Sequence, residues 1–233
     1  MADEVTAISR GNHRTPLPEE VATYVRERII SGEVRPGDFL RLEPIAEAMG
    51  ISNTPVREGL LTLQSEGFVE LVPRRGFMAA AFTEQDLRDL FWTQAQLASE
   101  LAARAAKRIT PEQLERLDAV LAEHEAAVDN DDAERMAALG HAFHREINLA
   151  ADSRRLTFLL AAAVKHLPNR FYASIEGQVE GARQDHPKIV EALHRRDVRK
   201  VRSLMNQHIL AGADRLVDEL SKRGLWSDEE SVS

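Results

Sequence analysis

Residues 41–77 constrain the fold of this chain more than any other stretch. They read RLEPIAEAMGISNTPVREGLLTLQSEGFVELVPRRGF, an order that predicts two helices joined by a tight turn and then a hairpin. Pro44 suits the first turn of a helix, because its missing N–H has no intrahelical partner there. Gly50 can adopt the left-handed conformation that ends this helix, and Ser52 is a suitable N-cap for the next one.

The second predicted helix carries its apolar residues on one face. Three of them recur at helical spacing, at Val56, Leu60 and Leu63. Gly67 ends the run, and two short strands are predicted next, over residues 68–72 and 77–82. The tip between the strands carries two arginines and a glycine, namely Arg74, Arg75 and Gly76.

This order of elements is typical of a winged helix-turn-helix. The first turn of the second helix is expected to present Asn53, Thr54 and Arg57 outward, as a recognition helix does towards base edges in the major groove. The cations at the hairpin tip suit contact with a phosphate backbone or minor groove. The alternative is a helical hairpin with solvated arginines, and the Arg-Arg-Gly tip favours the DNA-binding interpretation.

Over roughly residues 17–80 the sequence resembles a known family. The run SNTPVREGLLTLQSEGFVELVPRRGF, with RPGDFLRL before it, is similar to the DNA-binding domain of GntR-type bacterial transcription regulators. Two positions depart from that pattern, since Asn53 stands where many members have Arg and Gly59 where they have Ala. With this resemblance, the residues that we predict to contact DNA are Arg41, Ser52, Asn53, Thr54, Arg57, Arg74, Arg75 and Gly76.

Net charge limits how DNA could be bound. The chain carries −8 overall, and its first 80 residues contain 9 Lys and Arg against 12 Asp and Glu, or −3. A surface that is acidic on average should bind non-specific DNA weakly. We therefore expect affinity to depend on correct geometry and on dimerisation.

The compartment is expected to be the cytoplasm. The chain has no cysteine, which fits a reducing environment. Its polar N-terminal residues do not form a secretory signal, and no apolar run approaches the roughly 20 residues of a membrane span.

A length of 233 residues suggests two modest domains. The predicted fold is mostly α, a winged helix-turn-helix followed by an antiparallel six- or seven-helix bundle. We assign residues 1–16 to a disordered arm, 17–82 to the winged domain, 83–222 to an all-helical effector-binding and dimerisation domain, and 223–233 to a flexible acidic tail. Helix starts are expected at Thr83, Thr110, Asp132, Ser153, Gly181 or Gln184, and Asp197, with a kink at Pro168.

Three histidines occupy apolar faces of three different predicted helices. They are His144, His186 and His208. Such residues could be core side chains or ligand-binding polar groups, or they could converge on one divalent metal, which neutral imidazole suits. The remaining bundle histidines, His124, His141, His166 and His194, are expected to be surface or structural.

Residues 84–221 resemble the FCD effector domain of FadR-like regulators. In metal-binding members of that branch, an Asp-x3-His pair and two later histidines hold a divalent cation. The contexts AFHREI, DHPKIVEAL and MNQHI match His144, His186 and His208 to those histidines. The aspartate position is Gly140, which supplies no oxygen. The resemblance implies a divalent metal, with Zn or Ni expected.

The effector position also departs from metal-binding members. They often carry Arg and Glu on the first bundle helix, where this chain has Gln94 and Ala98. Glutamine cannot replace the charge of arginine towards a carboxylate, so a simple carboxylic acid is not assumed. The candidate effector-binding residues are Gln94 and Arg170.

These observations predict a homodimeric, ligand-responsive repressor that binds a pseudo-palindromic operator and is not an enzyme. A metal-dependent hydrolase or lyase using the three histidines is the alternative. It lacks a convincing general base, since Glu146 follows His144 by two positions and points to another helix face. An architectural DNA binder without a ligand is the third hypothesis, which a bundle of about 140 residues disfavours.

Overall fold

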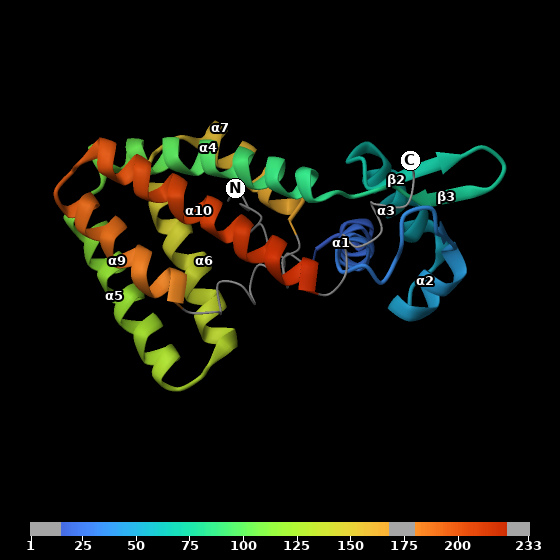
Figure 1. Cartoon of the computed structure of the whole chain (residues 1–233), viewed down its shortest axis with the longest axis horizontal. Helices are drawn as coiled ribbons and strands as arrows, with labels where there is room; N and C mark the ends of the chain where they lie inside the picture. The colour runs from blue at the N-terminus through green and yellow to red at the C-terminus, as the bar shows by residue number, and fades with distance from the viewer. Residues whose placement is uncertain (1–14, 168–179, 223–233) are drawn as a thin grey trace, which may run out of the picture. The chain divides into compact units, whose positions relative to one another are not determined.

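The computed structural model describes residues 15–167 and 180–222, and it is mostly helical, as predicted. The described residues form two compact units, one made of 15–26 and 35–80 and the other of 27–34 and 81–222 (Figure 1). The predictions for the N-terminal arm, Pro168, Arg170 and the acidic tail fall on or extend into residues outside the described ranges. No described helix combines the length and the apolar character needed to cross a membrane.

The first unit has the predicted order of helix, helix-turn-helix and hairpin. Its elements are α1 (Leu17–Ile30), β1 (Phe39–Leu40), α2 (Leu42–Met49), α3 (Asn53–Ser65), β2 (Val69–Val72) and β3 (Gly76–Ala79). The last four residues of α1, 27–30, belong to the second unit. Gly50 ends α2 in the left-handed conformation, with φ 65°. Ser52 occupies the N-cap position of α3, but its side chain makes no capping hydrogen bond.

The sheet differs from the predicted two-stranded hairpin in two respects. A third strand, β1, pairs with β3 and gives the antiparallel order β1-β3-β2. Two residues are too short for the alternation that reveals a strand in sequence. The second predicted strand ends at Ala79 and not at residue 82, because Ala79 pairs with Val69, the first residue of β2.

The core of this unit forms where α1 crosses α3. Val56, Leu60 and Leu63 of α3 are fully buried, as the helical spacing predicted. Gly59 lies on the same face, and a Cβ there would stand 2.7 Å from the carbonyl oxygen of Pro18 and 2.7 Å from Val21 of α1. The missing side chain therefore lets the two helices approach closely.

A buried ion pair fixes α1 to the end of α3. Arg26 is 2% exposed, and its guanidinium donates to the carboxylate of Glu66. The same guanidinium lies 5.5 Å from the centre of the Phe68 ring. No periodic pattern predicts this contact, because the two charged residues are 40 positions apart.

The second unit is a bundle with six described helices. They are α4 (Glu84–Arg108), α5 (Pro111–Asp129), α6 (Ala133–Ala150), α7 (Arg154–Lys165), α9 (Glu180–His194) and α10 (Val198–Lys222). Thr83 and Thr110 form capping boxes with Asp86 and Gln113, and Asp132 caps α6. Ser153 stands at the N-cap position of α7 without a side-chain capping bond.

Helices α4 and α10 lie side by side along the bundle (Figure 1). Arg88 of α4 donates to Asp214 of α10 at 2.8 Å, and Glu100 of α4 pairs with Arg202 of α10 at 2.6 Å. Because residue numbers rise along α4 as they fall along α10, the two helices are antiparallel. This register fixes which side chains of the two helices lie at one level.

Candidate nucleic-acid interface and candidate metal centre

Predicted DNA-contacting residues from three separate elements line one groove of the first unit. The groove has a volume of about 410 Å³ and is bordered by the start of α2, by α3 and by the β2–β3 hairpin. Its lining includes Arg41, Arg57, Arg74, Arg75 and Gly76. None of the four guanidiniums forms an ion pair with a carboxylate of the described residues. The groove is therefore a concave, cationic surface on a unit whose sequence is acidic on average.

The first turn of α3 is exposed beside these residues. The residues that face solvent are Ser52, Asn53, Thr54 and Arg57. Val56, directly before Arg57, is fully buried. The helix therefore presents polar side chains at its N-terminal end, where its N–H groups and partial positive charge also suit an anion.

The hairpin tip has an unusual backbone that helps to aim its arginines. Arg74 adopts φ 64° and Gly76 adopts φ 102°, both in the left-handed half of φ space. A non-glycine residue with positive φ is uncommon and marks a tight turn. The Arg75 N–H closes this turn by donating to the Val72 carbonyl at 3.1 Å.

In the second unit, the three predicted histidines meet. His144 of α6, His186 of α9 and His208 of α10 each bring a ring nitrogen within 4.8 Å of the other two. The Nε2 atoms of His186 and His208 are 3.2 Å apart. Two nitrogens bound to one tetrahedral zinc ion would lie about 3.3 Å apart, since each Zn–N bond is about 2.0–2.1 Å. The spacing of these imidazoles therefore fits a shared divalent ion.

Protonation also suits a metal site. Burial lowers the pKa of His186 well below its usual 6.5, and the neighbouring charges of His144, His208 and His124 act in the same direction. Neutral imidazole, the form that binds metals, is therefore favoured. His208 has a carboxylate behind it, with Asp185 Oδ2 3.4 Å from its Nδ1. The hydrogen bond with His208 lowers the pKa of Asp185, so that carboxylate stays ionised.

A fourth histidine lies near this cluster and was not singled out as a site residue. His124 of α5 is buried, with its ring centre 6.3 Å from that of His186. Phe143 of α6 stacks on the His186 ring, with the two ring centres 3.8 Å apart. The position of His124 seven residues after the buried Leu117 is a helical signal that could have revealed its burial.

Gln94, the predicted effector residue of α4, is buried at the same level as the histidines. Along α4, Gln94 stands midway between Arg88 and Glu100. Those two residues pair with Asp214 and Arg202 of α10. His208 stands midway between these two partners. The antiparallel register therefore places Gln94 level with His208. The second predicted effector residue, Arg170, lies outside the described residues.

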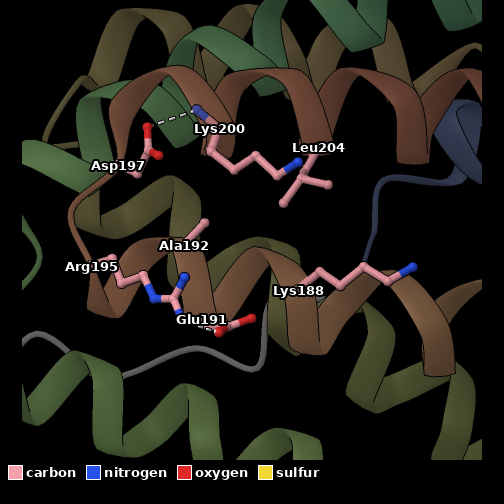
Figure 2. A pocket seen from close by; sticks show the side chains of 7 residues that line it. All are labelled: Lys188, Glu191, Ala192, Arg195, Asp197, Lys200 and Leu204. Atoms are coloured by element: carbon pink, nitrogen blue, oxygen red, sulfur yellow. Dashed lines mark hydrogen bonds and ion pairs between the residues drawn. The ribbon is translucent and has the colours of Figure 1, made fainter.

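A small pocket of about 150 Å³ opens elsewhere between α9 and α10. Figure 2 shows that charged side chains surround it, with Glu191 on α9, Arg195 just after the end of that helix and Lys200 on α10. Arg195 is paired with Glu191 at 2.5 Å, and Lys188 lies 3.5 Å from Asp185. None of the predicted site residues within the described ranges lines this pocket, and we assign it no role.

The arrangement gives no support to hydrolytic chemistry through Glu146. Its carboxylate accepts a hydrogen bond from Arg116 of α5 at 3.0 Å and also lies 3.9 Å from Arg145. The carboxylate that such a reaction would need as its base is thus already engaged by two arginines.

Comparisons with known proteins agree with this architecture. Residues 17–78 match the family described as bacterial regulatory proteins, gntR family, and residues 89–211 match the FCD domain. The chain is 23% identical over 229 residues to the HTH-type transcriptional repressor RspR of Escherichia coli K12, covering 97% of this chain and 100% of that protein.

A second relative and a solved structure point the same way. The HTH-type transcriptional repressor GlaR of Escherichia coli K12 is 29% identical over 204 residues, covering 80% of this chain and 90% of GlaR. The solved structure of E. coli McbR/YncC shares the fold, with a TM-score of 0.63 and 21% identity over 88% of this chain and 99% of that one. The chain belongs to the GntR family of bacterial transcription regulators, and its helical unit is an FCD domain.

Proposed function

We propose that this protein is a repressor that binds a pseudo-palindromic operator as a homodimer and responds to a small metabolite bound in its FCD domain. The observation that carries the proposal is the groove lined by four arginines beside the exposed first turn of α3. We assign residues 17–82 to the DNA-binding domain and residues 83–222 to the effector domain. Its place of action is the cytoplasm, where its DNA target lies.

The DNA contacts that we propose divide into two kinds. Asn53, Thr54 and Arg57 reach base edges from the first turn of α3, with Ser52 at the adjoining N-cap position. The backbone contacts come from the rest of the groove, through Arg41, Arg74, Arg75 and the close approach that Gly76 allows. Without a side chain, Gly76 can bring its N–H towards a phosphate.

Homodimerisation is supported by an exposed apolar face on the FCD domain. Phe158 of α7 is 63% exposed and Trp92 of α4 is 58% exposed, on two helices that pack against each other. Leu159 is also exposed on α7. A second copy of the chain would remove these side chains from water, and its two-fold symmetry would match two operator half-sites.

For the metal, we propose His144, His186 and His208 as ligands, with Zn or Ni as the ion. Three imidazoles leave open coordination positions, and a bound ion would there attract oxygen donors of an effector. Asp185 orients His208 by accepting from its Nδ1, which directs the Nε2 lone pair towards the other two rings. Gln94, level with His208, offers an uncharged amide to the same ligand.

The effector acts only through its different affinities for two arrangements of the DNA-binding domains. Such coupling is typically about 1–3 kcal/mol between two sites. An effector that binds the repressing arrangement less well would weaken operator binding and release transcription.

The DNA-binding proposal is tested with Arg57→Ala. The operator probe is a duplex that the wild-type protein selects from a random-sequence library. We expect a loss of roughly 10- to 150-fold in affinity, measured by fluorescence anisotropy, with an unchanged dimer mass. Arg145→Ala removes the same charge from the exposed surface of α6 and serves as the control. Equal affinities for Arg57→Ala and wild type would refute the recognition-helix assignment.

The metal proposal is tested with His144→Ala. Wild-type protein dialysed against Zn or Ni should retain about one ion per chain by elemental analysis, and His144→Ala should retain little. His141→Ala removes an exposed histidine of the same helix and should leave the stoichiometry unchanged. If wild-type protein retains no ion after metal addition, the three-imidazole site is wrong.

Dimerisation through the apolar face is tested with Phe158→Asp. A charge at this exposed position should not disturb the bundle core, but it would be costly inside an interface. We expect the mass measured by light scattering to fall from two chains towards one. Arg145→Ala, on α6, lowers the net charge by the same one unit and controls for the altered charge. An unchanged dimer in Phe158→Asp would place the interface elsewhere.

A further inference from the structure

We infer that Phe39 is a positioning residue for DNA binding, which holds Arg41 and Arg75 together at the groove. The inference rests on the proposed DNA contacts and adds a residue that no sequence motif singled out. Phe39 belongs to β1, the strand that sequence patterns did not reveal, and its side chain is half-buried.

Phe39 contacts two arginines that come from different parts of the unit. The Arg75 guanidinium, from the hairpin tip, lies 4.3 Å from the centre of the Phe39 ring. The Arg41 guanidinium, two residues further along the chain, lies 5.7 Å from the same ring centre. Both distances are within the range of about 6 Å over which a cation is attracted to an aromatic ring.

The two arginines would otherwise oppose each other. Both line the same groove, and two positive charges near one another repel. An aromatic ring that attracts both cations offsets part of this repulsion and restricts two long side chains before DNA arrives. Binding then requires less ordering of the arginines, which raises affinity without adding charge.

Strand geometry explains why position 39 can do this. Residues two apart in extended backbone point to the same face, and Arg41, at the N-cap of α2 just after β1, is extended. Phe39 and Arg41 therefore share a face while Leu40 between them enters the core. Leu40 is buried and pairs with Phe77 of β3. The core contribution of β1 therefore comes mainly from Leu40, and Phe39 is available for the arginines.

The test compares variants that keep the net charge constant. Phe39→Leu removes the ring, and we expect it to weaken binding of the selected operator duplex by about five- to thirtyfold, the equivalent of two exposed cation–π contacts. Phe39→Tyr keeps the ring and should bind like wild type. The slope of log affinity against log salt should stay the same in Phe39→Leu, whereas Arg75→Ala should reduce it by about one phosphate contact.

A double-mutant cycle separates positioning from a structural role. Arg75→Lys keeps the charge and weakens stacking, so its loss of affinity should be smaller in the Phe39→Leu background than in wild type. Thermal unfolding of each variant identifies any loss of fold, and the Phe39→Tyr comparison remains decisive if Phe39→Leu is destabilised. The inference would be overturned if Phe39→Leu bound DNA like wild type, or if Phe39→Tyr failed to bind. It would also be overturned if the losses of affinity from Phe39→Leu and Arg75→Lys multiplied fully in the double variant. A wild-type protein that selects no DNA would overturn the proposed function as well.

Discussion

The DNA-binding unit and the FCD domain place their functional side chains in opposite environments. The arginines of the groove are exposed and fall within 34 positions of the sequence. The histidines of the bundle lie largely in its interior and come from three helices, with 64 positions between the first and the last. One site lies on the surface of a small unit, and the other exists only when distant helices pack.

The two sites should therefore respond to different conditions, one to ionic strength and the other to packing. Exposed cations bind through charge that salt screens, so the groove should be sensitive to ionic strength. Burial favours the neutral form of His186, so the bundle site should depend on packing and on the carboxylate behind His208. The predictions below test this contrast, beginning with the largest effect.

Arg26→Ala should cause the largest loss of stability. The change removes the buried guanidinium that donates to the carboxylate of Glu66, and breaking a buried ion pair typically costs about 3–5 kcal/mol. Chemical denaturation would measure the loss. The groove itself is untouched, so a fall in DNA affinity should accompany unfolding and be absent under conditions where the variant is still folded.

A matched control for Arg26 lies on the same helix. Arg28 pairs with Glu33 at 3.1 Å, and these side chains are 39% and 61% exposed. Arg28→Ala should therefore cost no more than about 1 kcal/mol. Equal losses of stability in Arg26→Ala and Arg28→Ala would show that the DNA-binding unit does not depend on its buried ion pair. The exposed groove would then not rely on the packed interior beneath it.

Asp185→Asn tests the buried site through a residue that is not one of the proposed ligands. The amide cannot carry the charge that favours the Nδ1 proton on His208, so we expect metal affinity to fall about 10- to 100-fold. Competition with a chromophoric chelator would measure it.

The control is a carboxylate–histidine pair on the surface. Asp118 lies 3.1 Å from His194, and both are about half exposed. Asp118→Asn should leave metal affinity unchanged. If both variants bind metal like wild type, the site does not rely on an oriented His208, and the proposed role of Asp185 is wrong.

Much of the fold could be predicted from sequence because its signals are local. Gly50, the capping boxes at Thr83 and Thr110, and the burial of Val56, Leu60 and Leu63 all follow from spacing within one helix or turn. β1 escaped prediction because two residues carry no period, and only its pairing with β3 makes it a strand. Arg26 and Glu66 escaped because nothing local relates residues 40 apart.

The three-histidine site could also be predicted only as far as local signals reach. Helical stripes predicted that His144, His186 and His208 point inward, but spacing cannot say that three helices bring them within 4.8 Å. Resemblance to FCD domains supplied that step. Phe39 and Asp185 lie within the stretches RPGDFLRL and DHPKIVEAL, but their contacts with arginines and with His208 emerge only from tertiary structure.

Gly59→Ala should destabilise the DNA-binding unit by a smaller amount. The new Cβ would meet the backbone oxygen of Pro18 at 2.7 Å, and a backbone atom cannot rotate away. Overpacking typically costs about 1–3 kcal/mol, while alanine gains at most about 1 kcal/mol of helix propensity. We expect a net loss of roughly 1–2 kcal/mol by denaturation. An unchanged or raised stability would show that α1 can move away from α3.

Gly212→Ala is the corresponding change in the bundle, with the smallest effect and the opposite sign. Gly212 lies inside α10, and an added Cβ would stand 3.5 Å from the Phe91 ring of α4, an ordinary contact distance. Helix propensity then decides, and the variant should gain about 0.5–1 kcal/mol in the same denaturation measurement. Because Phe91 lies close to Gln94 along α4, metal affinity should be checked beside stability. A loss at Gly212 as large as that at Gly59 would mean that the bundle, like the α1–α3 crossing, has no room along the helix that carries His208.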